Sequence, residues 1–194
     1  MSKREEKKLA LLNVGCDVIY SKGYHATGIQ DIVNAANIPK GSFYNYFDSK
    51  ETFAVEAIEY VAEQIHAILK KALTNAEISP LARIFSFFDQ MIAHFTQTNF
   101  EKGCLVGNMC QEMSDSSSAI RTAADTQMQR FSALFAGCLR EAIEAGEISP
   151  ETDIDTLSEF IFNSWEGALL RMKSSKSGKP LLQFREVLEQ VILH

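Results

Sequence analysis

Side chains that can bind a nucleic-acid backbone gather in one short segment, residues 40–46, with the sequence KGSFYNY. The cation, hydroxyls and amide of this segment belong to Lys40, Ser42, Tyr44, Asn45 and Tyr46. Cations and hydroxyls bind phosphate oxygens, and the amide of Asn45 can form two hydrogen bonds with an adenine edge. Gly41 adds no side chain near the start of the segment, where the free N–H groups of a helix attract an anion. The segment therefore has the chemistry to contact DNA.

Four cysteines supply the other reactive groups of the chain: Cys16, Cys104, Cys110 and Cys138. They form no CxxC pair and no Cys/His spacing typical of a metal site, so we expect reduced thiols, no metal and no cofactor. Cys104 follows Gly103 at the expected start of a helix, next to Lys102, and both features favour a reactive thiolate. Cys104 is therefore either a sensor of oxidants or electrophiles, or a buried small hydrophobic residue.

A thiol-dependent enzyme is one alternative function. Cys104 or Cys110 would be its nucleophile, which requires a positioned base and a site that stabilises an anion. No histidine lies close to either cysteine in the sequence, so we expect that the protein is not an enzyme. A helical adaptor that does not bind DNA is a second alternative.

The charge of the chain restricts the kind of partner. The 194 residues include 19 basic and 25 acidic ones, giving a net charge of −6. Proteins that coat nucleic acid without selectivity bind it through positive charge, so that class is disfavoured. Residues 1–50 nevertheless carry a net charge of +2 and the remainder −8, which suits local contact with an anionic partner. With no signal peptide and no apolar run of the ~18 residues that span a bilayer, we expect a cytoplasmic protein without a membrane partner.

The elements that must position residues 40–46 are predicted to be short helices. Apolar residues at three- and four-residue steps predict a first helix over 3–21, which Gly23 ends. Thr27 then offers an N-cap hydroxyl to a second helix, whose apolar face ends at Ala36.

A turn of about four residues follows the second helix. Asn37 tolerates the left-handed backbone that such a turn needs, and Pro39 suits the first turn of the next helix, over 40–46. Phe43 and Phe47 lie four residues apart, so both can point inward and leave the polar residues of this helix on its outer side.

Longer helices are predicted for the rest of the chain. Asp48 and Glu51 predict a capping box at the start of a helix over 49–73. Further helices are predicted over 80–98, 104–113, 118–145, 153–173 and 181–193. Polar residues 174–180 are predicted to interrupt the last two. Gly and Pro are scarce, at 10 and 4, so we expect an all-α fold of about nine helices.

Two short helices joined by a four-residue turn form the helix-turn-helix arrangement, in which the second helix enters the major groove of DNA. Any packed helical hairpin has a similar periodicity. The spacing alone therefore leaves both a DNA-binding role and a purely structural hairpin open.

Residues 8–58 resemble the N-terminal domain of the TetR family of one-component transcriptional regulators. The resemblance rests on Gly23-Tyr24, Thr27, the run DIVNAANIPKGSFYNYF and Ser49-Lys50-Glu51. Asn37 stands where Gly is usual, and Val33 where Ala is common. The resemblance implies an N-terminal three-helix DNA-binding domain, residues 1–50, and a C-terminal helical ligand-binding and dimerisation domain, residues 51–194.

The resemblance also implies a mechanism. A homodimeric repressor binds a palindromic double-stranded DNA operator and leaves it when a small-molecule effector binds, with the helix over 49–73 as the lever. The residues implied to contact phosphates are Thr27, Lys40, Tyr44, Tyr46 and Lys50. Ser42 and Asn45 are implied to lie nearest the base edges.

The family implies that the last two helices of each subunit pack as a four-helix bundle. Apolar faces within residues 157–169 and 181–192 agree with this, although both faces could instead complete the core of one subunit.

The segment GCLVGNMCQEM (103–113) and the later WEGALLRMK (165–173) are similar to a TetR subgroup that contains the N-ethylmaleimide reductase and acrylate-responsive regulators. This similarity implies a small effector that is electrophilic or acidic. Candidate residues for its pocket, which could alternatively form plain core, are Phe88, Met91, Phe95, Cys104, Met109, Met113 and Trp165.

Overall fold

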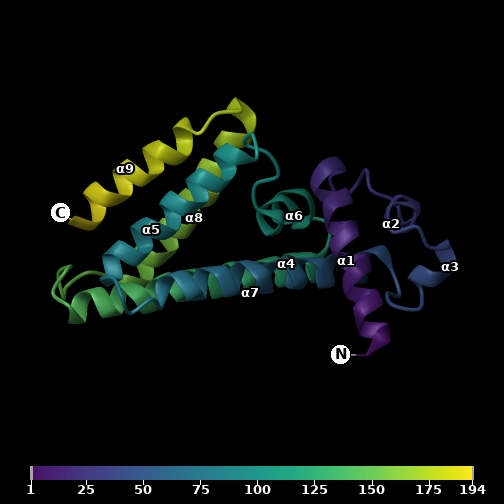
Figure 1. Cartoon of the computed structure of the whole chain (residues 1–194), viewed down its shortest axis with the longest axis horizontal. Coiled ribbons are helices and arrows are strands. Elements are labelled where there is room, and N and C mark those ends of the chain that lie inside the picture. The colour runs from purple at the N-terminus through teal and green to yellow at the C-terminus, as the bar shows by residue number, and fades with distance from the viewer. Residues whose placement is uncertain (1, 194) are drawn as a thin grey trace. The chain divides into compact units, whose positions relative to one another are not determined.

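The computed structural model describes residues 2–193 and contains only helices and their connections over that range (Figure 1). Its helices are α1 (Lys3–Lys22), α2 (Ile29–Ala35), α3 (Lys40–Phe43), α4 (Lys50–Leu73), α5 (Pro80–Gln97), α6 (Leu105–Met113), α7 (Ser118–Glu144), α8 (Ile154–Ser175) and α9 (Lys179–Leu193). The predicted all-α fold of about nine helices is confirmed. Among the described residues, none of the helices is both long and apolar enough to cross a membrane.

The described chain forms two compact units. The first contains the chain up to Gln64 together with Leu105–Gln127, and the second contains Ile65–Cys104 and the chain from Met128 onward. Helices α4 and α7 each contribute residues to both units. We predicted that the DNA-binding domain ends at residue 50. The first compact unit extends beyond that residue and also includes α6 and the start of α7.

An aromatic cluster forms the core of the first unit. Phe43, Phe47 and Phe53 are buried. The ring centroid of Phe47 lies 5.3 Å from that of Phe43 and 5.0 Å from that of Phe53, and the centroids of Phe43 and Phe53 are 5.8 Å apart. Gly15 of α1 lies against this cluster, because a Cβ there would come within 2.3 Å of the Phe53 ring. Ile32 of α2 is fully buried. Burial of apolar surface therefore stabilises α2 and α3, which are too short, at 7 and 4 residues, to be stable alone.

Gly23 ends the first helix as predicted, and the left-handed backbone predicted for Asn37 after the second helix is confirmed. Gly23 ends α1 with φ +81°, and Asn37 follows α2 with φ +54°. The N-cap predicted for α2 is wrong, because Gly28 and not Thr27 precedes the helix. The amide of Gly28 donates to the carboxylate of Asp31 at 2.7 Å.

The capping box predicted for α4 is also wrong. The helix begins one residue later than expected, at Lys50, so Asp48 lies too early to cap it. Ser49 takes that position, and its hydroxyl accepts a hydrogen bond from the amide of Thr52 at 3.0 Å. Glu51 instead accepts a hydrogen bond from Ser117.

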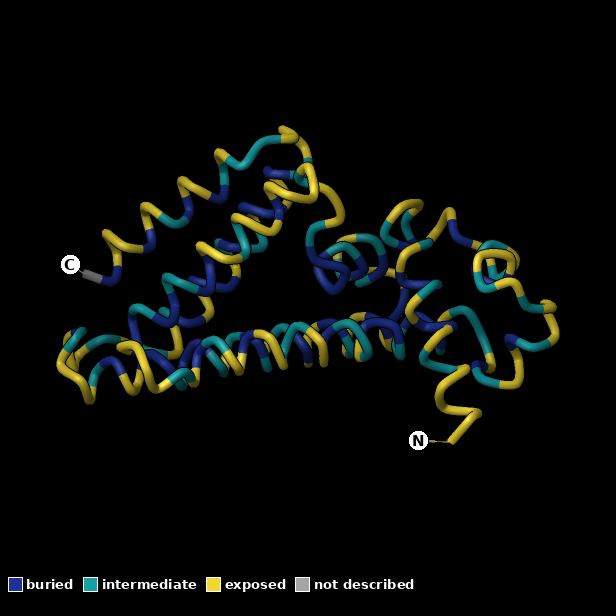
Figure 2. Tube along the Cα trace, in the orientation of Figure 1, coloured by how far each residue is buried: buried dark blue, intermediate teal, exposed yellow. Residues whose placement is uncertain are grey.

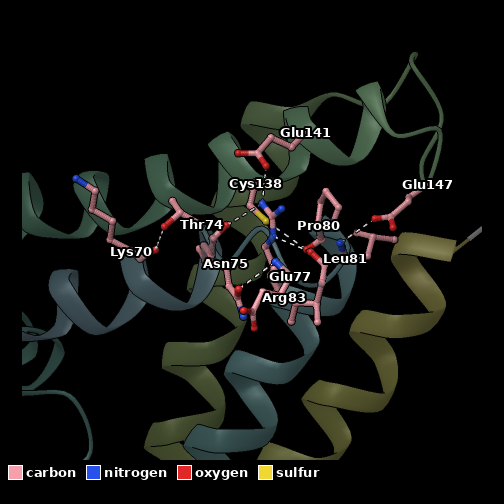
Figure 3. Close-up of polar contacts among 12 residues, drawn as sticks. Lys70, Thr74, Asn75, Glu77, Pro80, Leu81, Arg83, Cys138, Glu141 and Glu147 are labelled. Atoms are coloured by element: carbon pink, nitrogen blue, oxygen red, sulfur yellow. Dashed lines mark hydrogen bonds and ion pairs between the residues drawn. The ribbon is translucent and has the colours of Figure 1, made fainter.

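A buried arginine joins three elements of the second unit (Figure 3). The Arg83 guanidinium on α5 donates to the backbone carbonyls of Leu73, at 3.3 Å, and Ile78, at 3.0 Å. It also pairs with the carboxylate of Glu141 on α7. One side chain thereby joins the end of α4, the connection to α5 and the last part of α7.

The break between α8 and α9 is shorter than predicted. Helix α8 continues to Ser175, and Lys176 ends it with a left-handed φ of +48°. Because α9 begins at Lys179, only residues 176–178 lie outside the two helices. The prediction that residues 174–180 as a whole are non-helical is therefore wrong, since one left-handed residue suffices to end a helix.

Candidate nucleic-acid interface

A tight turn over residues 36–39 joins α2 to α3. The amide of Ile38 donates to the carbonyl of Val33 at 3.0 Å, and the left-handed backbone of Asn37 allows the chain to reverse there. Pro39 has φ −62°, close to the helical value, and leads directly into α3. Helices α2 and α3 therefore form a helix-turn-helix.

Helix α3 is shorter than the predicted helix over 40–46. It ends at Phe43, and residues 44–46 continue as turns. The amide of Phe47 still donates to the carbonyl of Phe43 at 3.1 Å, so the two aromatic residues keep their helical spacing. The physical reason is low helix propensity. The residues responsible are Gly41, Ser42 and Asn45.

Burial separates this segment into two sides. Phe43 and Phe47 are 0% and 1% exposed, whereas Tyr44 is 51% exposed. The exposed or half-buried residues are Lys40, Gly41, Ser42, Tyr44, Asn45 and Tyr46. Six of the residues predicted to contact DNA therefore offer accessible atoms, while the aromatic residues between them anchor the segment to the core.

Lys50, the first residue of α4, lies against an aromatic ring. Its ammonium is 4.0 Å from the centroid of the Tyr24 ring, a cation–π contact. Burial lowers the pKa of Lys50 below its ordinary value, and the nearby carboxylates of Glu112 and Asp31 offset only part of this shift. The ring restricts the position of a cation that we predicted to contact a phosphate.

The side chain of Thr27, a residue that we predicted to contact a phosphate, is covered by the rest of the chain. Thr27 is 0% exposed, and its hydroxyl donates to the carbonyl of Gly23 at 2.6 Å. A fully covered hydroxyl has no surface to offer a phosphate. Thr27 instead closes the loop between α1 and α2.

The sequence interpretation missed Arg4. Its guanidinium donates to the backbone carbonyl of Asn45 at 2.9 Å, across 41 residues of sequence. Because this contact depends on how α1 packs against the turn after α3, no local pattern could have predicted it. It fixes the backbone next to an amide that we predicted to read bases.

Three of the effector-pocket candidates lie together in the second unit. Phe88 and Phe95 are buried with Trp165, and the Trp165 centroid is 5.0 Å from that of Phe88 and 6.4 Å from that of Phe95. Phe135 and Phe184 extend the cluster, with centroids 5.5 and 4.8 Å from that of Phe88.

The other candidates are divided between the units. Met91 is half-buried on α5 in the second unit, whereas Met109 and Met113 are buried on α6 in the first. Cys104 is 9% exposed and hydrogen-bonds Glu166, whose pKa burial raises to about 7.

A groove lies elsewhere in the second unit, along α8 and α9. Its volume is about 550 Å³, and none of the seven pocket candidates lines it. Within residues 2–193, no group of three or more His, Cys, Asp or Glu side chains is placed to hold a metal ion.

Two family models match most of the chain. Residues 11–57 match the model described as bacterial regulatory proteins, tetR family. Residues 80–188 match the model described as tetracyclin repressor-like, C-terminal domain. The first match includes the helix-turn-helix and Lys50, and the second includes the aromatic cluster of the second unit.

Curated relatives and solved structures agree with these matches. The chain is 34% identical over 183 residues to the HTH-type transcriptional repressor DhaR of Mycobacterium sp. (strain GP1), covering 94% of this chain and 90% of the relative. It is 36% identical over 179 residues to the transcriptional regulator AcuR of Cereibacter sphaeroides, covering 90% and 80%. The crystal structure of the reduced form of NemR from Escherichia coli superposes with a TM-score of 0.89 at 28% identity, covering 95% of this chain and 96% of that one.

Proposed function

This chain belongs to the TetR family of transcriptional regulators, and we propose that it is a homodimeric repressor of a palindromic operator, released by a small-molecule effector. Like its relatives, it is a DNA-binding regulator and not an enzyme, so the thiol-enzyme and adaptor alternatives are set aside. We propose that it acts in the cytoplasm.

The outward polar side of the segment 40–46 is the observation that carries the proposed DNA contact. In this proposal Lys40, Tyr44, Tyr46 and Lys50 bind phosphates, while Ser42 and Asn45 lie nearest the base edges. Gly41 supports a close approach to DNA, since nothing among the described residues lies within 4 Å of a Cβ built there. The buried Phe43 and Phe47 keep this side facing outward.

An exposed apolar face supports the proposed dimer. Five large apolar side chains on α8 and α9 are 47–58% exposed: Phe160, Leu170, Leu182, Val187 and Val191. All of them except Leu170 belong to the apolar faces predicted from sequence, and most other residues of those faces are buried in the subunit. Exposed stretches recur along the whole length of α9 and alternate with buried ones (Figure 2). A second copy of the chain would cover this face, and two copies present two recognition segments to half-sites one helical turn apart.

The second unit supports a proposal about the effector. Its aromatic cluster of Phe88, Phe95 and Trp165 is the apolar part of the proposed pocket, and Cys104 beside Glu166 is the polar part. We propose a small electrophilic or acidic effector. Cys104 should be alkylated faster than Cys138 if it senses an electrophile, because burial raises the pKa of the Cys138 thiol to about 11. Equal alkylation of the two residues in mass spectrometry would remove thiol sensing from the proposal.

Selection of DNA by the purified full chain tests the proposed function. The chain is mixed with a library of random-sequence duplexes, and bound molecules are recovered and sequenced over several rounds. We expect enrichment of a palindrome whose half-sites are centred about 10 base pairs or a multiple apart. Recovery of no sequence preference, at any salt concentration that permits binding, contradicts the proposal.

A further inference from the structure

Glu112 on α6 is bound to the loop that leads into the helix-turn-helix. One oxygen of its carboxylate accepts a hydrogen bond from the amide of Tyr24 at 2.8 Å, and the other accepts one from the amide of His25 at 2.6 Å. Helix α6 accordingly lies beside the C-terminal end of α1 (Figure 1). Hydrogen bonds to a carboxylate are roughly twice as strong as those between neutral groups. One half-buried side chain of α6 therefore holds two consecutive amides of this loop.

Gly23 allows this carboxylate to approach the loop. A Cβ at residue 23 would lie 3.2 and 3.4 Å from the oxygens of Glu112, and its φ of +81° also disfavours any side chain. The amide of Gly23 donates to the carbonyl of Ile19 at 2.8 Å, and its carbonyl accepts the hydroxyl of Thr27. Both backbone polar groups of Gly23, at the start of the loop, are therefore hydrogen-bonded.

Tyr24 connects Glu112 to a proposed phosphate-binding cation. The backbone of Tyr24 is held by Glu112, and its ring, in a residue that is 8% exposed, lies under the ammonium of Lys50. The carboxylate of Glu112 also attracts this ammonium. A change at Glu112 therefore acts on Lys50 both through the ring and through its charge.

A second contact joins the same part of the chain to α4. Ser117, which is 5% exposed, donates from its hydroxyl to the carboxylate of Glu51 at 2.6 Å. That hydroxyl also accepts the amide of Ile120 at 3.2 Å, near the start of α7. The segment 112–117 is therefore bound both to the loop before α2 and to the first turn of α4.

We propose that Glu112 is a positioning residue for DNA binding, which holds the loop before α2 and the Lys50 ammonium in the DNA-binding arrangement without touching DNA itself. This inference rests on the proposed function. Displacement of α6 breaks both hydrogen bonds together, because they share one carboxylate. The loop and the Lys50 ammonium are then released at the same time.

The variant Glu112→Gln tests this inference, with Asp115→Asn as its control. Glutamine keeps the size of the side chain but has only one oxygen to accept the two amides. Asp115 is exposed in the turn after α6, so its variant removes the same charge without a loop bond. The probe is the duplex that the unmodified chain selects from the random library. We expect Glu112→Gln to weaken binding at least tenfold and to reduce the salt slope by about one unit, the loss of one phosphate contact. Asp115→Asn should not weaken it.

A double-variant comparison separates positioning from general loss of structure. Lys50→Ala should weaken binding of the unmodified chain but should have little further effect in the Glu112→Gln chain, because the cation is already misplaced. Fully additive effects of the two changes contradict the inference. If Glu112→Gln does not fold, Tyr24→Leu tests the same connection, since it keeps an apolar side chain and removes the ring. It should likewise reduce the salt slope by about one unit, and an unchanged slope contradicts the inference.

Amide hydrogen exchange provides a measurement without DNA. The amides of Tyr24 and His25 should exchange at least tenfold faster in Glu112→Gln than in Asp115→Asn. If the unmodified chain selects no duplex, the proposed function fails, and this inference with it. If it does select one, and Glu112→Gln matches Asp115→Asn in affinity, slope and exchange, only the inference about Glu112 fails.

Discussion

Arg83 donates a hydrogen bond at 3.3 Å to the backbone carbonyl of Leu73, the last residue of α4. The same guanidinium pairs with Glu141, whose side chain is 48% exposed, while that of Arg83 is only 9% exposed. The asymmetry matters, because the carboxylate keeps much of its hydration and the arginine does not. Arg83 therefore supplies a hydrogen-bond donor to a backbone carbonyl at the end of α4.

Removal of Arg83 should destabilise the protein more than removal of its acidic partner. We expect Arg83→Ala to lower the free energy of unfolding by about 3 kcal/mol, since it leaves the carbonyls of Leu73 and Ile78 without this donor. Glu141→Ala should cost about half as much. Urea denaturation measures both. Arg140→Ala breaks an ion pair with Asp155 between exposed side chains and should have an effect below about 0.5 kcal/mol.

Two glycines in helices should respond to alanine in opposite directions. At Gly15 the new Cβ would lie 2.3 Å from the Phe53 ring, so Gly15→Ala should destabilise the protein by roughly 2 kcal/mol. At Gly137, in α7, nothing within the described chain lies within 4 Å of the new Cβ. Gly137→Ala should therefore raise stability by about 0.5–1 kcal/mol, because alanine favours the helix. Thermal unfolding of the two variants compares them directly, and the same sign for both would contradict the packing described for Gly15.

The proposed dimer can be tested with two leucine-sized side chains that are equally exposed. Leu182 on α9 and Ile68 on α4 are both 58% exposed. Leu182→Glu places a charge on the face proposed to be covered by a second copy, so sedimentation should show a monomer with DNA affinity reduced at least a hundredfold. Ile68→Glu should leave the assembly unchanged. A dimer that survives Leu182→Glu would show that α9 does not form the interface.

Lys40 and Asn45 should have different effects on DNA binding. Lys40→Ala should weaken binding to all duplexes about equally and reduce the salt slope by about one unit, as loss of a phosphate contact does. Asn45→Ala should instead relax the preference at one base position, by about 1–3 kcal/mol. Binding measured over a salt series, on the selected duplex and on single-base variants of it, distinguishes the two. Reversal of the two patterns would mean that the segment docks in another orientation.

Glu166 should make stability depend on pH. Burial raises its pKa from the ordinary 4.5 to about 7, so the folded protein holds a proton that the unfolded chain releases. The stabilisation from this group is complete below pH 4.5 and is lost as the pH rises through about 7, a change on the order of 3 kcal/mol. Glu166→Gln should flatten the stability profile over this interval. Stability curves for the two proteins from pH 4.5 to 8 check this, and parallel curves would contradict it.

Local pattern was sufficient to predict the helices and the helix-turn-helix. Apolar spacing marks each helix, Gly23 marks the end of the first one, and Asn37 marks the turn after the second. The predicted N-caps were displaced by one residue, because Gly28 and Ser49 compete with equally suitable neighbours. Helix α3 was predicted too long because the prediction used the spacing of apolar residues, which does not take into account the low helix propensity of the residues between them.

The contacts between distant parts of the chain could not be predicted from sequence. Glu112 lies 88 and 87 residues from the amides that it holds, and Arg4 lies 41 residues from Asn45. Neither contact has a local pattern, since each joins residues that meet only when the chain folds. The burial of Thr27 is likewise a tertiary effect. Two of the pocket candidates, Met109 and Met113, have helical spacing but belong to the first unit.

The loop between α1 and α2 has a consequence for engineering the chain. Its amides at residues 23, 24, 25, 27 and 28 each have a fixed acceptor, so an inserted or deleted residue would pair donors with the wrong oxygens. The number of residues in this connection is therefore fixed by its hydrogen bonds. Reporter peptides and affinity tags belong instead at residues 149–151, an exposed part of the connection between α7 and α8.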